Sequence, residues 1–247
     1  MKILALEFSS AQRSVAVVRA ALRGDGLSAT ESDAVSNRTG THATHFSTVM
    51  VSEVVETGSG AKDALGMIDE ALRTAKVDRE QIERVAVGIG PGSYTGIRAA
   101  IALAQGWQLA RGVQLLGISS AGCLALQALA GGLIGRVNVV INAQRDEFYM
   151  AGYEIRPGGM GAECCLEVEP LRLTPLAEVR EHEHAGEVLI GPEVTRWFPH
   201  ARIIFPSAAM LAEMAINRND FVPGEKIEPI YLRETSFVKA PPPRLAP

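Results

Sequence analysis

Residues 84–111 read RVAVGIGPGSYTGIRAAIALAQGWQLAR, and this stretch decides the fold class. The apolar run at residues 84–89 predicts a buried strand. A glycine-rich turn follows from Gly90 to Gly96, and residues 97–111, which end at Gly112, have the pattern of a helix. A strand that passes through a tight turn into a helix is the unit from which α/β folds are built. The sequence therefore predicts an α/β protein.

Upstream of this unit, the chain predicts three strands and a helix. Residues 2–8 and 14–18 are apolar around a polar break and indicate a hairpin, and alternating valines within residues 49–55 indicate a third strand. From Ala61 to Ala75 the apolar residues recur at helical spacing, with charged residues between them. Residues 20–46 are rich in Gly, Ser, Thr and Asp and predict a long loop.

Downstream, the pattern of the first hairpin returns. A short strand at residues 113–118 leads into a helix that Ser119 or Ser120 can cap and that runs to about residue 130. The strand, turn and strand of the hairpin then recur, with Asn142 at the place of Glu7. The second-half elements are strands at 137–143, 147–155, 164–168, 188–190 and 202–205 and helices at 176–183 and 207–218.

This repetition predicts two related lobes. We expect the first to comprise residues 1–132 and the second residues 133–247. The last helix and tail, residues 207–247, follow the second lobe but could pack back on the first. The repetition is one of topology and not of residue identity.

The composition is that of a folded protein without a strong charge. The chain has 247 residues, of which 47% are hydrophobic, and 24 basic against 28 acidic side chains give a net charge of −4. This balance offers no field for nucleic acid, and the aromatic residues are scattered and do not alternate with basic residues in a regular pattern, so direct RNA binding is not predicted. No apolar run reaches the length of a membrane span, so we expect a cytoplasmic protein with no membrane partner.

The glycine-rich turn is a candidate phosphate or nucleotide loop. Its backbone N–H groups and the helix N-terminus favour an anion, with Ser93 or Thr95 as N-cap and Arg98 as an added charge. The turn fits neither the Walker A nor the dinucleotide pattern, because Thr95 stands where the third glycine belongs. A plain tight turn is the alternative. The candidate residues are Gly90, Pro91, Gly92, Ser93, Tyr94, Thr95, Gly96 and Arg98.

Other catalytic patterns are weak. Residues 117–121 resemble a nucleophile elbow but lack its final glycine, and the histidines downstream allow a Ser-then-His order by chance alone. Cys123, Cys164 and Cys165 cannot all pair and stand near no histidine cluster, so we expect reduced thiols and no metal site. The small residues of helix 97–111 allow close packing, either on the chain's own sheet or against another subunit.

Several segments resemble the TsaB (YeaZ) family. Residues 90–98 (GPGSYTGIR), 104–106 (AQG) and 116–119 (LGIS) are similar to the family's GPGSFTGxR, AQGL and IGVS, and residues 142–149 are similar to its IDARMGEVY segment. Residues 229–233 (PIYLR) resemble its PxYLR close. The resemblance implies the actin-like fold shared by sugar kinases and heat-shock chaperones, with two lobes of βββαβαβα type and a reduced second lobe.

The resemblance also implies a function. The family provides the partner subunit of TsaD, with TsaE joining, in the bacterial complex that transfers a threonylcarbamoyl group to the adenosine beside the tRNA anticodon. ATP-using relatives carry an acid in each first hairpin, where this chain has Glu7 and Asn142, and TsaD carries a metal-binding histidine pair where this chain has Ser120 and Leu124. We therefore expect a non-catalytic subunit with no cofactor or metal of its own, which reaches tRNA only through the complex.

The same resemblance implies the interacting surface. The family's TsaD interface uses the first two helices, and in isolation the same face could close a homodimer. One departure is that the family's histidine at the head of the first helix aligns with Gly60. An independent ATP-dependent phosphotransferase and a peptidase are the alternatives to the scaffold. The interface residues expected from the resemblance are Ala61, Ala64, Leu65, Ile68, Leu72, Ile97, Ala100, Ile101, Ala104 and Gln105.

Overall fold

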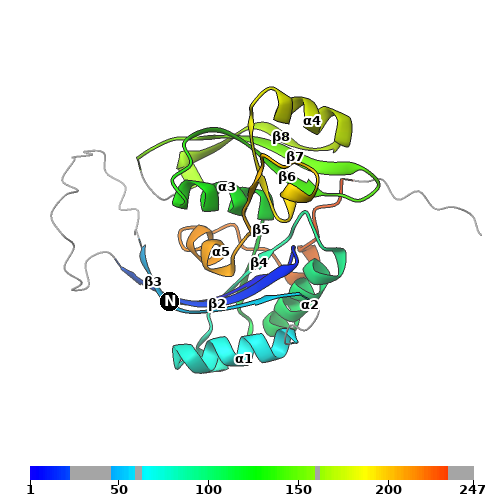
Figure 1. The fold of residues 1–247 in the computed structure, drawn as a ribbon. Coiled ribbons are helices and arrows are strands. Elements are labelled where there is room, and N and C mark those ends of the chain that lie inside the picture. Colours follow the sequence, from blue (N-terminus) through cyan, green and yellow to red (C-terminus); the bar gives the residue numbers. More distant parts are fainter. Residues whose placement is uncertain (23–45, 59–62, 159–161, 233–247) are drawn as a thin grey trace, which may run out of the picture.

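Two five-stranded sheets, one in each lobe, form the frame of the molecule (Figure 1). The computed structural model describes residues 1–22, 46–58, 63–158 and 162–232. The strand order is β3-β2-β1-β4-β5 in the first sheet and β10-β9-β6-β7-β8 in the second. In each sheet an antiparallel three-stranded meander is extended by parallel strands, so the predicted repetition of the hairpin is confirmed.

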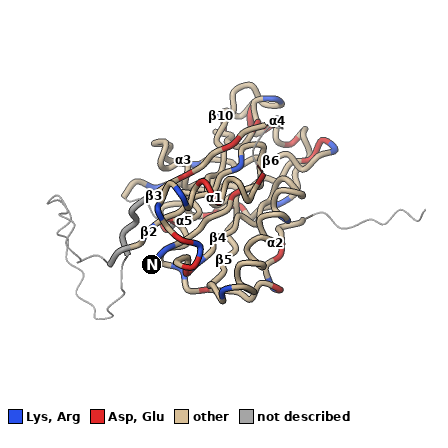
Figure 2. The backbone as a smooth tube through the Cα atoms, turned by 90° about the horizontal axis from the view of Figure 1, so that it is seen from below, with Lys and Arg blue, Asp and Glu red and all other residues tan. Residues whose placement is uncertain are grey.

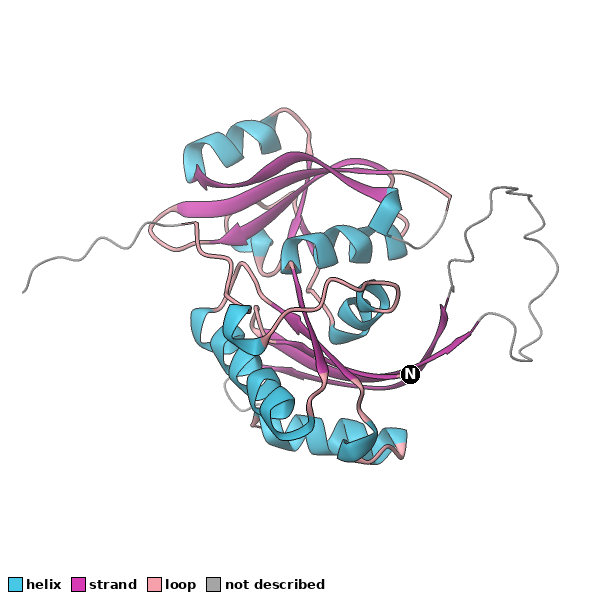
Figure 3. Cartoon of the chain, turned by 180° about the vertical axis from the view of Figure 1, so that it is seen from behind, coloured by secondary structure: helices cyan, strands magenta, loops and turns pink. Residues whose placement is uncertain are grey.

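The first sheet has helices on both faces. Leu4 and Leu6 of its central strand face one core with α1 and α2, whereas Ile3 and Ala5 face a second core with α5. Figure 3 shows α1 and α2 on the outer side of this sheet and α5 between the two lobes. The elements are β1 (Lys2–Glu7), β2 (Gln12–Leu22), β3 (Phe46–Thr57), α1 (Ala64–Ala75), β4 (Arg84–Gly88), α2 (Tyr94–Arg111), β5 (Gln114–Ile118) and α3 (Ser120–Ala130).

The second sheet packs between α3 on one face and α4 on the other. Its edge strand β8 continues to Pro175, well beyond the predicted end at Val168. The extension escaped prediction because the charged residues of this strand, such as Glu169 and Arg172, lie on an exposed sheet edge and interrupt the apolar pattern. The elements are β6 (Gly135–Asn142), β7 (Glu147–Ile155), β8 (Cys165–Pro175), α4 (Leu176–His184), β9 (Val188–Gly191), β10 (Arg202–Ile203) and α5 (Ala208–Ala215).

Side-chain caps fix where the helices begin. The Ser93 side chain caps α2 by accepting a hydrogen bond from Gly96 N, so Ser93 rather than Thr95 is the N-cap. Ser119 caps α3 in the same way. Asp63 caps α1, which begins at Ala64. The predicted start of this helix, Ala61, lies outside the described residues.

After the second lobe, the chain returns to the first. Beyond α5, Val222 N donates to Leu115 O and Ile230 N donates to Ile89 O, so the segment runs along β5 and the glycine-rich turn. Figure 2 shows basic and acidic residues interspersed along the described chain. Among the described residues, no helix is both long and apolar enough to cross a membrane. All three cysteines are free thiols.

Candidate functional site

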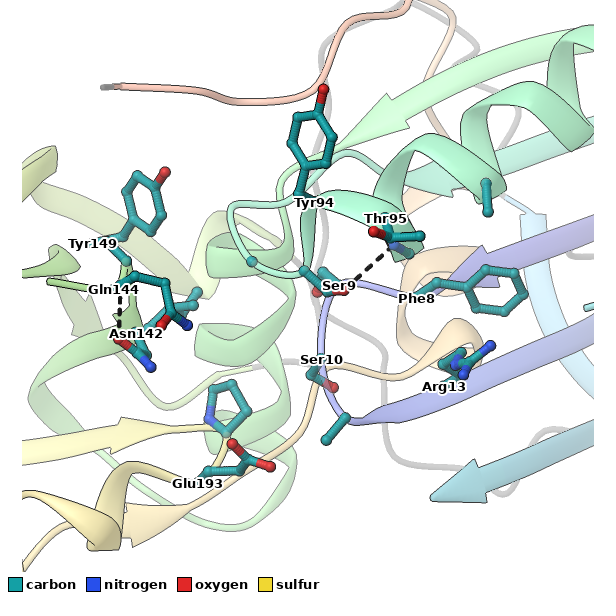
Figure 4. Close-up of a pocket in the computed structure, with 18 of the residues that line it drawn as sticks. Phe8, Ser9, Ser10, Arg13, Tyr94, Thr95, Asn142, Gln144, Tyr149 and Glu193 are labelled. Carbon is teal, nitrogen blue, oxygen red and sulfur yellow. Dashed lines mark hydrogen bonds between the residues drawn. The ribbon is translucent and has the colours of Figure 1, made fainter. Parts of the chain in front are cut away.

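A cleft of about 1050 Å³ lies between the lobes, where the turns of the two hairpins approach each other. Figure 4 shows Ser9, Ser10 and Tyr94 of the first lobe on one wall and Asn142 and Tyr149 of the second lobe on the other. The two hairpin turns, the start of α2 and the residues after β9 supply most of the lining. The lining residues with charged or polar side chains include Arg13, Gln144, Arg145, Glu193 and Tyr231.

The glycine-rich turn forms part of this cleft, but its glycines serve the packing of the chain itself. A Cβ atom at Gly92 would lie 2.1 Å from Ser9 O, and one at Gly96 would lie 2.0 Å from Phe8 O. The Ser93 N–H donates to Ser9 O at 2.7 Å and is therefore unavailable to a ligand. Glycine is required at these positions because two backbone segments are in contact and leave no room for a Cβ atom. This requirement would exist in a tight turn that binds no ligand.

The predicted charge of the turn, Arg98, does not line the cleft. Its guanidinium donates to the Tyr94 hydroxyl at 3.0 Å. Tyr94 in turn stacks on Tyr231, with ring centroids 5.4 Å apart, at the mouth of the cleft. Arg98 thus supports an aromatic pair between α2 and the C-terminal segment, and Gly90 and Pro91 also lie outside the cleft lining.

Glu7, the acid of the first hairpin, is fully buried and does not line the cleft. Its carboxylate accepts hydrogen bonds from Ser9 N at 2.7 Å and from the Ser120 hydroxyl at 2.9 Å. Burial raises the pKa of Glu7, although both hydrogen bonds oppose this shift. A Cβ at Gly88 would lie 2.1 Å from Glu7 Oε2, so a glycine within an apolar strand was the sequence signal for this buried carboxylate.

Asn142, the counterpart of Glu7, does line the cleft. Its Oδ1 accepts a hydrogen bond from Gln144 N at 2.8 Å and shapes a turn in which Gln144, Arg145 and Asp146 have φ of 66°, 60° and 56°. A neutral amide that is already engaged in a turn is a poor ligand for a divalent cation.

The actin-like arrangement raises the question whether the cleft could hold a Mg²⁺–nucleotide. The two hairpin positions that would supply anionic oxygen to the metal hold a buried, fully engaged carboxylate and an amide. Within the described part of the chain, no three His, Cys, Asp or Glu side chains are close enough together to hold a metal ion. The residues present therefore do not fit a Mg²⁺–nucleotide site.

The serines of the elbow-like segment have structural roles. The Ser120 hydroxyl donates to Glu7, and the Ser119 side chain caps α3. His182, which could complete a Ser-then-His order, lies on α4 in the second lobe, where its Nδ1 is 3.1 Å from Oε2 of Glu187. The structure does not bring a nucleophile and a base together at this segment.

Most of the side chains expected at the interface on α1 and α2 do not lie on the surface of the chain. Six of the side chains are buried in the core under the first sheet: Ile68, Leu72, Ile97, Ala100, Ile101 and Ala104. The apolar stripe that predicts a helix is the stripe that the chain buries against its own sheet. Ala64 faces the cleft, the Gln105 side chain donates to Gly224 O at 2.8 Å, and Ala61 lies outside the described residues.

The outward face of these helices includes two of the expected residues, Leu65 and Ile68, together with several others. A shallow hollow of about 370 Å³ lies between α1 and α2, lined mainly by apolar atoms and bordered by Arg79, Glu80 and Arg111. Leu65 of the expected interface lies here and is 56% exposed, and Leu109 on the outer face of α2 is 91% exposed. The other lining residues are Ile68, Ala102, Leu103, Gly106, Trp107 and Ala110.

Gly106 lies in this hollow, and among the described residues nothing outside its own helix contacts the place where its side chain would be. It is in the middle of α2, it has no positive φ, and a Cβ built on it would meet no atom within 4 Å. A glycine in a helix interior destabilises the helix by about 0.5–1 kcal/mol relative to alanine. Ala102 and Ala110 stand four residues away on either side and are also exposed. The outer face of α2 thus presents a row of small, exposed residues at this place.

Comparison with known proteins gives one family. The family model described as TsaD, tRNA N6-adenosine threonylcarbamoyltransferase, matches residues 61–185. An uncharacterized protein of Mycobacterium tuberculosis is 35% identical over 114 residues, which are 45% of this chain and 52% of that protein, so the match spans about half the relative's length. The tRNA threonylcarbamoyladenosine biosynthesis protein TsaB of Haemophilus influenzae is 32% identical over 198 residues, which are 73% of this chain and 83% of that protein.

Among solved structures, YeaZ from Pseudomonas aeruginosa superposes with a TM-score of 0.67 and 22% identity, covering 94% of this chain and 99% of that chain. This is a likeness of the whole fold, which includes both lobes. The predicted actin-like fold is thereby confirmed.

Proposed function

The chain belongs to the TsaB (YeaZ) family, and on that premise we propose that it is a non-catalytic scaffold or activating subunit of the complex that attaches a threonylcarbamoyl group to tRNA adenosine. The proposed partners are the TsaD-type transferase and the TsaE-type ATPase of the same organism. The protein would work in the cytoplasm and meet tRNA only within the complex. The ATP and metal would belong to the partner subunits.

The observation that carries the proposal is the outer face of α2. Gly106 costs helix stability and serves no contact within the chain, so a partner that approaches the backbone closely is the physical reason to keep it. Two exposed leucines, Leu65 and Leu109, flank the approach and offer apolar area to be buried. A helix with small residues at the crossing point is the partner element that fits such a surface.

The same surface can serve a second copy of the chain when no partner is present. An apolar face that is used in a heteromeric complex tends to be covered in isolation, and a symmetric dimer through α1 and α2 would cover it. Partner and second copy would then compete for one face. We therefore expect a concentration-dependent homodimer that dissociates when the TsaD-type subunit binds.

The cleft favours the scaffold over the two alternatives. A phosphotransferase would need anionic metal ligands, and Glu7 is engaged with Ser9 and Ser120 inside the protein. A peptidase would need a metal or an activated nucleophile, and the hydroxyls of Ser119 and Ser120 have structural roles. The residues that the sequence suggested for either chemistry are thus engaged in structural contacts, which supports the scaffold.

Reconstitution tests the proposal directly. The purified chain is combined with the TsaD-type, TsaE-type and TsaC-type proteins, ATP, threonine, bicarbonate and tRNA, and modified adenosine is quantified. We expect product only when the chain is present together with its partners, and none from the chain alone. Modification that proceeds equally without this chain would contradict the proposed role.

A surface variant tests the interface separately. Leu109→Glu on α2 should abolish binding to the TsaD-type protein in calorimetry and reduce modification in parallel. Leu166→Glu on β8 is the matched control, because Leu166 is similarly an exposed leucine, 50% accessible, but lies on the second lobe. Equal binding by the two variants would remove the assignment of the interface to α2 while leaving the role in the complex open to the first test.

A further inference from the structure

Helix α5 follows the second lobe in the sequence but packs on the first. Its inward residues Ala208, Leu211, Ala212 and Ala215 are completely buried in the core on the inner face of the first sheet. In Figure 1 the helix lies between the two sheets, next to α3. The position of α5 therefore decides how the lobes are placed relative to each other.

First-lobe side chains bind the N-terminus of α5. Ser14 Oγ accepts a hydrogen bond from Ala208 N at 2.7 Å, and Glu53 Oε1 accepts one from Ala209 N at 3.1 Å. Ser14 and Glu53 stand on the adjacent strands β2 and β3, and Ser14 is fully buried. Unpaired N–H groups at a helix start need such acceptors, and here another lobe supplies two of them.

A first-lobe cation binds the other end of α5. The Arg84 guanidinium on β4 donates to Ile216 O at 3.2 Å and to Arg218 O at 3.4 Å, and lies 4.6 Å from the ring centroid of Phe221. A positive charge at a helix C-terminus and a carboxylate at its N-terminus both match the helix dipole. The first sheet thus holds α5 at both ends.

Helix α3 makes the reciprocal exchange. It follows the first sheet in sequence, yet Ala121, Leu124 and Ala125 pack in the core of the second lobe. Its first turn stays tied to the first lobe through the bond from Ser120 to Glu7. Each lobe therefore contributes one helix to the other.

The two exchanged helices also contact each other. Met210 and Met214 of α5 pack against the cores of both lobes. The Cys123 thiol on α3 donates to Ser207 O at 3.6 Å, and the Ser207 hydroxyl donates to Gln127 on α3 at 3.2 Å. Burial raises the pKa of Cys123 well above its ordinary value, so the thiol remains a protonated donor.

We propose that the exchanged pair α3 and α5 is a lock that holds the lobes at one angle, with Ser14, Glu53 and Arg84 as the residues that keep it closed. Opening or closing the cleft would slide α5 over the first sheet and break the hydrogen bonds that the buried Ser14 and the half-buried Glu53 and Arg84 make to this helix and the residues after it, which is unfavourable. The cleft would therefore keep one width whether or not a nucleotide is present. This inference does not depend on the proposed function.

The distance between the lips of the cleft tests the lock. Spin labels are placed at Thr95→Cys on the first lobe and Arg145→Cys on the second, both exposed positions, in a Cys165→Ser background because Cys123 and Cys164 are buried. Pulsed electron–electron double resonance should give one narrow distribution of distances between the two labels, and Mg²⁺–ATP should leave it unchanged. A broad or two-peaked distribution, or a shift on adding Mg²⁺–ATP, would overturn the proposal.

A clamp variant adds a second measurement. The clamp variant combines Ser14→Ala and Glu53→Ala and so removes both acceptors at the N-terminus of α5. It should broaden the distribution of distances between the two spin labels, whereas the control Glu225→Ala, at an exposed glutamate on the C-terminal segment, should not. A clamp variant that stays as narrow as the control would also overturn the proposal. If the clamp variant fails to fold, the proposal is still tested by the first measurement, because the labelled chain used there keeps Ser14 and Glu53.

Discussion

Replacement of Gly106 by alanine should stabilise the chain and weaken its association, and this opposite effect is the most direct test of the reasoning about α2. A methyl group at Gly106 would meet no atom within 4 Å, and the residue has no positive φ. Nothing inside the chain therefore opposes the substitution. Alanine also loses less backbone freedom on folding than glycine does.

The magnitude follows from helix propensity. Alanine is favoured over glycine in a helix interior by about 0.5–1 kcal/mol, which corresponds to a rise in melting temperature of up to about 2–4 °C for a chain of this size. At a surface where a partner backbone approaches closely, one extra methyl group costs about 1–3 kcal/mol. That cost weakens binding by about 5- to 150-fold.

Two assays on one variant separate these effects. Thermal or urea unfolding of Gly106→Ala gives the change in stability, and calorimetric titration with the TsaD-type partner gives the change in dissociation constant. A destabilised variant would refute the absence of an intramolecular role for Gly106. A stabilised variant that binds as tightly as the original chain would refute the close approach of a partner at this residue.

Three further outcomes are expected. Gly96→Ala should lower the urea midpoint by an amount equivalent to at least about 1–3 kcal/mol, because its Cβ would lie 2.0 Å from Phe8 O; a midpoint within error of the original would contradict this contact. Ala104→Asp should destabilise by about 3–5 kcal/mol or prevent folding, because Ala104 is completely buried; a folded variant that had lost only partner binding would restore Ala104 to the surface. The pKa of Glu7 is raised in the folded protein, so its contribution to stability is present at low pH and is lost as pH rises through the folded pKa. The stability of the original chain minus that of Glu7→Gln should therefore fall as pH rises, and a difference that is constant with pH would refute the shift.

Local sequence patterns were enough to predict most of the helices and strands and their order along the chain. Apolar spacing predicted the strands and helices, and the return of the hairpin at Asn142 predicted two lobes. Polar residues marked two helix starts as Ser93 or Thr95 and as Ser119 or Ser120, and the structure selects the first of each pair. These features depend on residues that are near each other in the chain, because side-chain periodicity and capping act over one or two turns. Local signals of this kind can be read without a structure.

Which surfaces are exposed, and which polar groups are hydrogen-bonded, became known from the three-dimensional structure. The apolar stripes that contain Ile68 on α1 and Ala104 on α2 indicated two helices. Periodicity alone could not show that the chain's own sheet covers both stripes and leaves Gly106 outside. Glu7 could be recognised as an acid at the end of a strand, but its partner Ser120 is 113 residues away. The reason is physical: burial and hydrogen bonding between distant segments depend on how the layers stack, and a sequence pattern records only which face of an element is apolar and not what covers it.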